Sequence, residues 1–436
     1  AIPGGTGAFS EGIFAVESKL QKDWNYGLTK DQAFTMIMNY GHWRGNARMV
    51  RAFVDRSADT IDWMMKNGVK FEKLFSNYPN GLYTWHIYEG RGAGWINLFL
   101  DKYKKAGQTL LTETWGEKLI EENGRIVGVE ATNKAGDRIT IRGAKATVIA
   151  TCGFFDNKEM REKYLRFPNA DGLAQTGKTG DGIRMVWSVG AGKEGTEVQA
   201  SYRPDPHGVG TTNHVSATAK QPHLWLTPKG ERFCNEIIML EWPFAGNVLE
   251  RIGGTMYVVY DQKTLDHMVK EEGIDLGVGV MVPVGTKLAN FSKEWDAAVK
   301  AGWAFKADTL DGLAKATGMN PEKLKKTVAD YNGYCAVRHD AEFAKDPKYL
   351  REVKTGPFYA IKSVASTLGG IKANERFEVV TQNEDPIPGL YAAGNDVGGM
   401  YGDSYDLLMA GSTVGFAVNS ARIAVGSAAE YIKTVK

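Results

Sequence analysis

Cysteine is scarce in this sequence, and its placement excludes several kinds of site. The three cysteines among 436 residues, Cys152, Cys234 and Cys335, lie far apart and form no Cys-x-x-Cys or Cys-x-x-Cys-His pattern. A disulfide scaffold, a cysteine-based zinc site and haem attachment are therefore unsupported. The histidines between residues 207 and 223 also lack metal-ligand spacing, so we predict no metal site.

Large net charge and long hydrophobic runs are absent as well. The formal net charge is +2, with 43% hydrophobic and 24% charged residues, which is ordinary for a globular protein. No apolar run reaches the roughly 18 residues that a membrane-spanning helix needs. The sequence therefore predicts neither a nucleic acid nor an anionic membrane as a partner, and no transmembrane segment.

Glycine, in contrast, is abundant, and it marks the stretch around which the chain is organised. Residues 389–405 read as a short buried strand that enters a glycine-rich loop, and a helix follows with its N-cap at Gly411-Ser412. Small residues at Gly415, Ala417 and Ala421 allow that helix to pack closely. A strand, a glycine loop and a helix N-terminus together aim N–H groups at an anionic or polarised ligand.

Local patterns predict several further elements. Residues 47–68 show apolar three-to-four spacing and predict a helix that ends at Gly68. Residues 90–105 predict another helix, and residues 107–114 predict a strand. The alternating segments on either side of Asn123-Gly124 predict a hairpin with a tight turn. A chain of this length exceeds one ordinary core, so we expect two domains, or one domain with a large insertion.

Four motifs together resemble the fumarate reductase/succinate dehydrogenase flavoprotein superfamily, which includes urocanate reductases and 3-ketosteroid dehydrogenases. They are Gly389-Leu-Tyr-Ala-Ala-Gly394, the loop Pro3–Gly12, Ala150-Thr-Cys-Gly153, and Thr179-Gly-Asp-Gly182. The resemblance implies non-covalently bound FAD and an α/β, Rossmann-like FAD-binding domain with an inserted α+β capping domain. Cys152 stands where the family has a glycine, and we interpret it as a small core residue rather than a reactive thiol.

The same resemblance implies the residues that bind the cofactor. They come from the N-terminal loop, the Ala-Thr-Cys-Gly strand end, the Thr-Gly-Asp-Gly turn and the C-terminal loop and helix. The set comprises Gly4, Gly5, Thr6, Gly7, Ser10, Gly12, Ala150, Thr151, Gly153, Asp181, Gly394, Asn395, Asp396, Gly411, Ser412 and Thr413.

The resemblance also implies a domain order. Composition changes near residue 201, and Gly230-Glu-Arg-Phe-Cys-Asn-Glu236 is similar to a motif of the family's capping domain. We expect residues 1–200 and 365–436 to form the FAD-binding domain and residues 201–364 to form the cap. Family members carry a strand with Gly-x-Gly-x-x-Gly upstream of the first loop. Because that strand is normally central, we expect the natural protein to be longer than this sequence.

The family's dicarboxylate chemistry is not implied for this chain. In fumarate reductases, paired His and Arg residues bind the substrate and an Arg protonates it. The corresponding positions here are Leu240, Ala365, a position near Ser201, and Tyr405. Two carboxylates would lose their hydration without cationic partners, at a cost of several kcal/mol. A fumarate or succinate substrate is therefore not expected.

Tyrosines and one glutamate offer other chemistry. Tyr405 resembles the Tyr that binds the substrate carbonyl in 3-ketosteroid dehydrogenases, although the Pro-Gly expected after it is absent. A phenol suits this role because it donates a hydrogen bond without bringing charge into an apolar pocket. The candidate catalytic residues are Tyr405, Tyr401, Tyr202 and Glu241, with the last or a Tyr as proton donor.

The predicted function is FAD-dependent hydride transfer between flavin N5 and an activated C=C bond, favoured as reduction of an enone or aryl acrylate. One alternative is a 3-ketosteroid-type dehydrogenase, and another is a non-catalytic flavoprotein-like binding subunit. The predicted partners are a small apolar unsaturated carbonyl compound and an electron donor, either a protein or a reduced flavin or quinone pool. A cytoplasmic location is the default, and export stays open.

Overall fold

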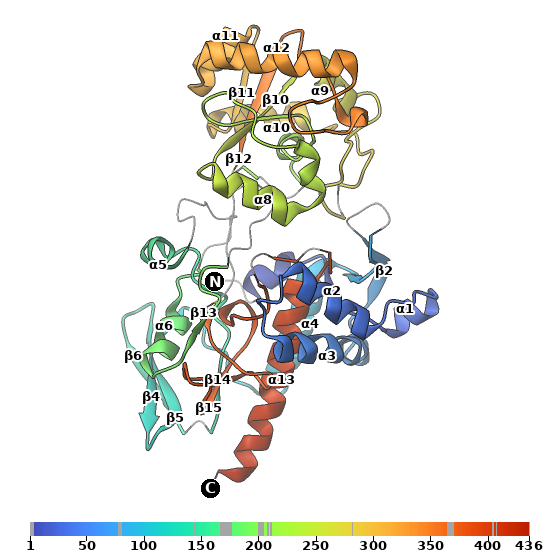
Figure 1. Cartoon of the computed structure of the whole chain (residues 1–436). Coiled ribbons are helices and arrows are strands. Elements are labelled where there is room, and N and C mark those ends of the chain that lie inside the picture. The colour runs from blue at the N-terminus through green and yellow to red at the C-terminus, as the bar shows by residue number, and fades with distance from the viewer. Residues whose placement is uncertain are drawn as a thin grey trace. The chain divides into compact units, whose positions relative to one another are not determined.

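The computed structural model describes residues 4–76, 81–143, 145–165, 177–198, 205–206, 209, 212–280, 282–363, 370–402, 405–406 and 408–435. The chain divides into two units, each with its own packing (Figure 1). The first unit comprises Ala1–Pro168, Gln175–Gln199 and Thr367–Lys436, and the second comprises Asn169–Ala174 and Ala200–Ser366. Among the described helices, none is both long enough and apolar enough to cross a membrane.

In its described residues, the first unit combines helices with four small sheets. Its strands are β1 Gly12–Phe14, β2 Phe71–Phe75, β3 Trp85–Tyr88, β4 Thr114–Glu122, β5 Arg125–Asn133, β6 Arg138–Arg142, β7 Thr147–Ile149, β8 Lys193–Glu194, β13 Gly370–Ile371, β14 Glu378–Val380 and β15 Pro386–Ala392. Its helices are η1 Gly5–Phe9, α1 Lys19–Asp23, α2 Lys30–Tyr40, α3 Ala47–Lys66, α4 Arg91–Lys105, α5 Lys158–Tyr164, α6 Asp181–Ser188, η4 Gly394–Asp396 and α13 Ser412–Thr434. The sheet orders are β1-β3-β2, β4-β5-β6, β14-β15-β7 and β13-β8.

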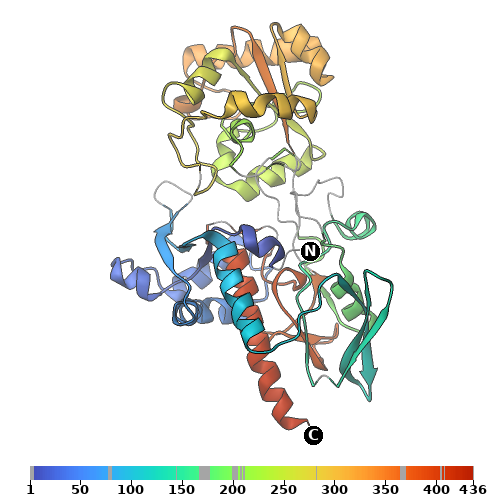
Figure 2. The same cartoon turned by 180° about the vertical axis from the view of Figure 1, so that it is seen from behind.

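The long helix α13 contacts several of these elements (Figures 1 and 2). It packs on α3, β1 and the parallel pair β7–β15. Its N-cap is Gly411, as the sequence predicted, with φ of 86° and no side-chain cap. A Cβ on Gly411 would lie 2.6 Å from the Phe14 nitrogen, and one on Gly415 would lie 3.0 Å from the Phe14 Cβ. Small residues are therefore required where the start of α13 meets β1.

Most of the local predictions in the first unit are confirmed. Helices α3 and α4 lie where the periodicity placed them, and Gly68 follows α3 with φ of 96°. Asn123 and Gly124 join β4 to β5 with φ of 53° and 73°. Positive φ at both central residues is the mark of a type I′ hairpin turn.

The strand predicted for residues 107–114 is wrong. Residues 108–112 adopt no regular structure, and β4 begins only at Thr114. Leu110 and Leu111 are 46% and 47% exposed, so their side chains gain little from burial. A strand also needs a hydrogen-bonded neighbour, and the described residues provide none along this segment.

The second unit is built around one antiparallel sheet. Its strands, β9 Leu224–Leu226, β10 Met256–Asp261, β11 Ala304–Ala307 and β12 Phe358–Ser363, pair in the order β11-β12-β10-β9. Its helices are α7 His214–Thr218, η2 Glu236–Leu240, α8 Trp242–Arg251, α9 Gln262–Val269, α10 Phe291–Lys300, α11 Leu310–Thr317, α12 Pro321–Val337 and η3 Pro347–Tyr349.

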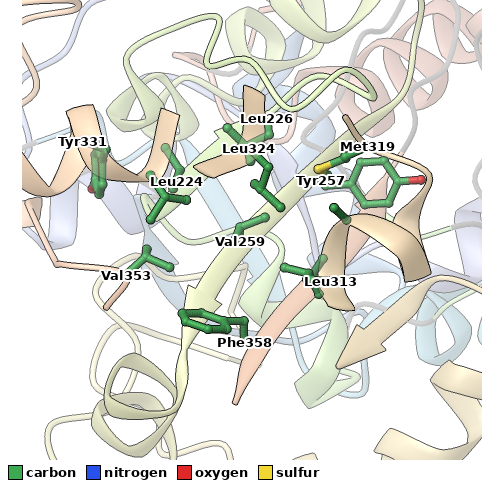
Figure 3. Close-up of a cluster of buried hydrophobic side chains, with 13 residues drawn as sticks. Leu224, Leu226, Tyr257, Val259, Leu313, Met319, Leu324, Tyr331, Val353 and Phe358 are labelled. Atoms are coloured by element: carbon green, nitrogen blue, oxygen red, sulfur yellow. The ribbon is translucent and has the colours of Figure 1, made fainter. Parts of the chain in front are cut away.

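Helices cover both faces of that sheet. On one face, Leu224 and Val259 pack with Leu313 of α11 and Leu324 of α12 in a buried hydrophobic cluster (Figure 3). Neighbouring strand residues point to the opposite face, because side chains alternate along a strand. There Tyr359 packs with α10. The second unit thus has three layers and a hydrophobic core of its own.

A buried network of charges, the ionic cluster, adds to this core. It consists of Arg232, Glu236, Asp340 and Lys345, all buried. The Arg232 guanidinium donates to Glu236 at 2.8 Å and to Asp340 at 2.7 Å, and Lys345 Nζ lies 3.2 Å from Glu236. Burial alone would raise the pKa of Asp340, but hydrogen bonds from Arg232 and from backbone N–H groups hold it well below its usual range. The motif at residues 230–236 therefore anchors the fold of the second unit.

Candidate active site

The first unit contains a cavity where the parallel strands β7 and β15 end. Its empty volume is about 690 Å³, which includes space open to solvent. The lining residues are Thr6, Gly7, Trp95, Ala150, Cys152, Ala393, Gly394, Asn395, Thr413, Val414, Ala417, Val418 and Ala421. Ligands of α/β folds bind in the crevice outside the carboxyl ends of parallel strands. This cavity, the main cavity below, occupies that position.

The structure brings part of the predicted cofactor set together around the main cavity. Six predicted residues line it, from four segments far apart in sequence: Thr6, Gly7, Ala150, Gly394, Asn395 and Thr413. Trp95, Val414 and Val418 also line it, and they were not among the predicted residues. The sequence offers no local signal at these three positions that separates a cavity wall from a core contact.

Asp396 uses its carboxylate within the protein. Both of its oxygens accept hydrogen bonds from the segment after β7: from the Thr151 N–H and hydroxyl, and from the Gly153 N–H at 2.7 Å. Burial raises the pKa of Asp396, and these hydrogen bonds oppose that rise. Asp396, Thr151 and Gly153 therefore join the ends of β7 and β15, next to residues that line the main cavity.

Other predicted residues also serve the local backbone. Ser10 donates its hydroxyl hydrogen to the Gly7 carbonyl at 2.7 Å. Gly12 lies in β1, where a Cβ would be 2.4 Å from the His86 carbonyl oxygen. Gly4 caps η1 with φ of 97°, and Gly5 has φ of 44°. These residues give the N-terminal loop its shape next to Thr6 and Gly7.

Asp181 does not line the main cavity. It lies in the first turn of α6, where its carboxylate accepts hydrogen bonds from the Thr179 hydroxyl at 2.6 Å and from Arg184 at 2.5 Å. With Trp115 of β4 it lines a different depression, of about 870 Å³.

Two predicted tyrosines meet at the N-terminus of α13. The Tyr401 hydroxyl donates to Ser412 Oγ at 3.2 Å, and the Thr413 hydroxyl donates to the Tyr405 oxygen at 2.7 Å. The two rings are 5.3 Å apart in an edge-to-face arrangement. We call Tyr401, Tyr405, Ser412 and Thr413 the hydroxyl cluster. Helix α13 thus places four neutral hydroxyls around its positive end.

The hydroxyl cluster adjoins the main cavity. Thr413 lines that cavity, and Tyr401 lines a small adjoining crevice that shares Gly394 and Asn395 with it. Both tyrosines are buried, and burial raises the pKa of each above its usual value of 10. The two phenols are therefore neutral at physiological pH.

Two catalytic candidates remain, Glu241 and Tyr202. Glu241 belongs to the second unit, where it ends η2 and precedes α8. Tyr202 lies outside the described residues.

Cys152 has an unusual backbone for a non-glycine residue. Its φ is 75°, in the left-handed region that favours glycine, and its Sγ lies 3.8 Å from the Thr6 hydroxyl. It also lines the main cavity. The prediction of a core residue is therefore incomplete, because the Cys152 side chain forms part of the cavity wall.

The side chains that line the main cavity are chemically suited to part of an FAD molecule. Ala393, Gly394 and Ala417 contribute small residues to the lining, and Trp95, Val414 and Val418 offer apolar contact. Helix α13 begins at the cavity without a side-chain cap, so its first N–H groups and its dipole favour an anionic or electron-rich group there.

Comparisons with known proteins identify the class. Residues 3–408 match the family model described as FAD binding domain. The chain belongs to this family and, with its reductase relatives, to the fumarate reductase/succinate dehydrogenase flavoprotein superfamily. It is an FAD-dependent oxidoreductase that acts on carbon–carbon bonds, as the sequence predicted.

Several individual proteins that this chain resembles belong to the same class. Vinyl phenol reductase of Lactiplantibacillus plantarum is 34% identical over 98% of this chain and 90% of its own length. NADH:acrylate oxidoreductase of Vibrio harveyi is 28% identical over 82% of this chain, which spans only 34% of that protein. Among solved structures, 3-ketosteroid Δ1-dehydrogenase of Sterolibacterium denitrificans has a TM-score of 0.79 at 18% identity, covering 99% of this chain and 93% of its own. At that identity the likeness shows the fold alone, and it confirms the predicted α/β FAD-binding architecture.

Proposed function

We propose that this protein reduces a C=C bond conjugated to a carbonyl or aryl group, in a substrate such as an enone, an aryl acrylate or a vinyl phenol. Bound FAD supplies the hydride. Two similar proteins are named for substrates of this kind, vinyl phenol and acrylate. The proposal excludes dicarboxylates, because Leu240 and Tyr405 stand where the family's fumarate reductases have arginine.

The observation that carries this proposal is the hydroxyl cluster. Tyr405 and Tyr401 are buried and neutral, and their hydroxyls lie at the positive end of α13 next to a cavity. A neutral donor stabilises the negative charge that develops on a carbonyl or phenol oxygen without requiring a counter-charge in an apolar site. The Thr413 hydroxyl donates to the Tyr405 oxygen, so the helix N-terminus fixes the position of this phenol.

For the cofactor, we propose that the main cavity takes part of the FAD. The N-terminal loop at Thr6-Gly7 and the turn at Gly394-Asn395 would contact it through the backbone, and Thr413 through its hydroxyl and the helix N-terminus. Asp396 would act indirectly, by holding Thr151 and Gly153 in place. The remaining predicted cofactor residues would shape the two loops.

The second unit is proposed as the cap, corresponding to residues 201–364 of the predicted domain order. A cap excludes water from a reacting centre and completes the substrate site. In this arrangement Glu241, or one of the tyrosines, delivers the proton to the substrate carbon. The electrons would come from a protein partner, a reduced flavin or a quinol.

A 3-ketosteroid-type dehydrogenase is the second candidate, because a neutral phenol donor also suits a steroid ketone. The two candidates differ in direction. A reductase passes electrons to the unsaturated compound, whereas a dehydrogenase takes them from a saturated ketone and needs an acceptor.

The test is anaerobic reoxidation of the reduced holoenzyme. We expect 4-vinylphenol, cinnamate or cyclohexenone to restore the oxidised-flavin spectrum, while fumarate, the matched control, does not. Reoxidation by fumarate alone would contradict the proposal. A steroid ketone that reduces the oxidised enzyme would favour the dehydrogenase. If none of these compounds changes the spectrum of a flavin-loaded protein, the chain is a binding subunit and the proposal fails.

A further inference from the structure

The second unit has a cavity of its own, which the proposed reaction does not use. Its empty volume is about 700 Å³, and it lies between α9, α10 and the strands β11 and β12. We call it the aromatic pocket, after Phe291, Trp295 and Tyr359, which line it. All of its lining residues belong to the second unit. The kind of ligand that the pocket can bind therefore depends on residues of the second unit alone.

Three aromatic rings shape the pocket. Phe291 and Trp295 of α10 are stacked, with centroids 5.2 Å apart and planes at 28°. The Tyr359 ring stands nearly perpendicular to both, at 79° to Phe291 and 84° to Trp295. Tyr359 and Phe291 are buried, while Trp295 is partly accessible. A planar ring that enters the pocket can therefore meet both the face and the edge of aromatic side chains.

Hydrogen bonds hold the wall on the α9 side. The Tyr359 hydroxyl donates to Gln262 Oε1 at 2.7 Å, and Gln262 Nε2 donates to Asp266 at 2.8 Å. The Asp266 carboxylate also pairs with Lys270 at 2.9 Å. The one acidic residue of the pocket is therefore neutralised within the wall.

Lys306 gives the aromatic pocket a positive charge. Its Nζ lies 5.4 Å from the centroid of the Tyr359 ring, and β11 holds it directly opposite Tyr359 in the sheet register. In the part of the chain that the structure describes, Lys306 makes no ion pair. A small aromatic box often suits a cationic ligand. Here the charge of Lys306 would repel a cationic ligand.

We propose that the aromatic pocket binds an aromatic anion, of the aryl carboxylate class. The ring would pack against Trp295 and Tyr359, and the carboxylate would pair with the Lys306 ammonium. A single unpaired cation favours a monoanion over a phosphorylated ligand. This proposal is independent of the reaction in the first unit, because it rests only on residues of the second.

The test uses the full chain in its flavin-loaded form, with benzoate as the probe. Calorimetry should detect binding that weakens about tenfold in Lys306→Gln, a loss of about 1.4 kcal/mol, and that Lys306→Arg retains. Lys300→Gln, an exposed lysine of α10 outside the pocket, is the control and should bind as the wild type does. Cyclohexanecarboxylate and benzyl alcohol should both bind more weakly than benzoate.

A second readout locates the bound benzoate. In protein labelled with 5-fluorotryptophan, benzoate should shift the fluorine resonance of Trp295, assigned with Trp295→Phe. The proposal is overturned if this resonance stays unmoved at about 10 mM benzoate, a concentration that saturates sites of millimolar affinity. It is also overturned if Lys306→Gln binds benzoate as tightly as wild type, or if tetramethylammonium shifts the resonance in place of benzoate.

Discussion

The two units bury polar groups in opposite ways. In the second unit the ionic cluster contains two basic and two acidic side chains, each in contact with an opposite charge. In the first unit the hydroxyl cluster contains no formal charge, and it adjoins a cavity. The ionic cluster lines none of the cavities described above.

The difference has a physical cause. A charge removed from water is stable only when partners surround it, so the four charged groups are fully engaged with one another and hold the fold. A neutral hydroxyl costs less to bury and can keep hydrogen-bonding capacity for a ligand. We therefore assign the ionic cluster to stability and the hydroxyl cluster to recognition.

The largest expected effect comes from breaking the ionic cluster. Replacing Arg232 by methionine leaves Glu236 and Asp340 as buried carboxylates without their main partner. We expect a loss of about 3–5 kcal/mol in the free energy of unfolding, measured with denaturant. The matched control is Lys323→Met, which breaks an exposed pair with Glu231 and should leave stability nearly unchanged. Equal effects of the two substitutions would remove the distinction between a buried network and a surface pair.

A pH titration tests burial in the first unit without touching the cavity. His86 is buried, and desolvation lowers its pKa to about 4. In the unfolded chain the histidine titrates near 6.5, so the unfolded state takes up a proton first as the pH falls. The stability contribution of neutral His86 is therefore complete above about pH 6.5 and declines by about 1.4 kcal/mol per pH unit toward pH 4.

The measurement is the free energy of unfolding between pH 7 and pH 4 for wild type and His86→Gln. Glutamine can hydrogen-bond to the Ser18 hydroxyl and the Thr84 carbonyl, which are both partners of the His86 ring. We expect a shallower pH slope in the variant. An unchanged slope would mean that other groups cause the acid sensitivity.

A smaller effect, on activity rather than stability, is expected at the hydroxyl cluster. Tyr405→Phe removes one neutral donor and should lower kcat/KM about 10–100-fold, while flavin content and unfolding stay close to wild type. Tyr401→Phe, which loses the bond to Ser412, is the matched comparison and should have the weaker effect. If both variants retain full activity on every substrate that reoxidises the enzyme, recognition lies elsewhere.

The smallest effect is expected at Cys152, where the backbone rather than the side chain sets the site. Its φ of 75° is compatible with glycine and poorly compatible with a β-branched residue. We expect Cys152→Gly to retain flavin and to change stability by less than about 1 kcal/mol, and Cys152→Val to be about 1–2 kcal/mol less stable than Cys152→Gly. Denaturant unfolding and flavin absorbance measure both. If Cys152→Val were more stable than Cys152→Gly, the positive φ at residue 152 would not be maintained in the folded protein.

Features that depend on a few consecutive residues were predictable. The Asn123-Gly124 turn, the end of α3 at Gly68 and the start of α13 at Gly411 follow from glycine and asparagine, which tolerate positive φ. The predicted strand at residues 107–114 failed because pairing, unlike a turn, needs a partner from elsewhere in the chain.

The sequence by itself determined the family, the cofactor class and the segments that surround the main cavity, because these reside in short motifs with their own backbone chemistry. Tertiary structure alone decided which side chains face that cavity. It directed Asp396 to the segment after β7, placed Asp181 at another depression and brought Trp95 into the wall. The reason is that a side chain's environment depends on neighbours distant in sequence, and no motif records which neighbours those are.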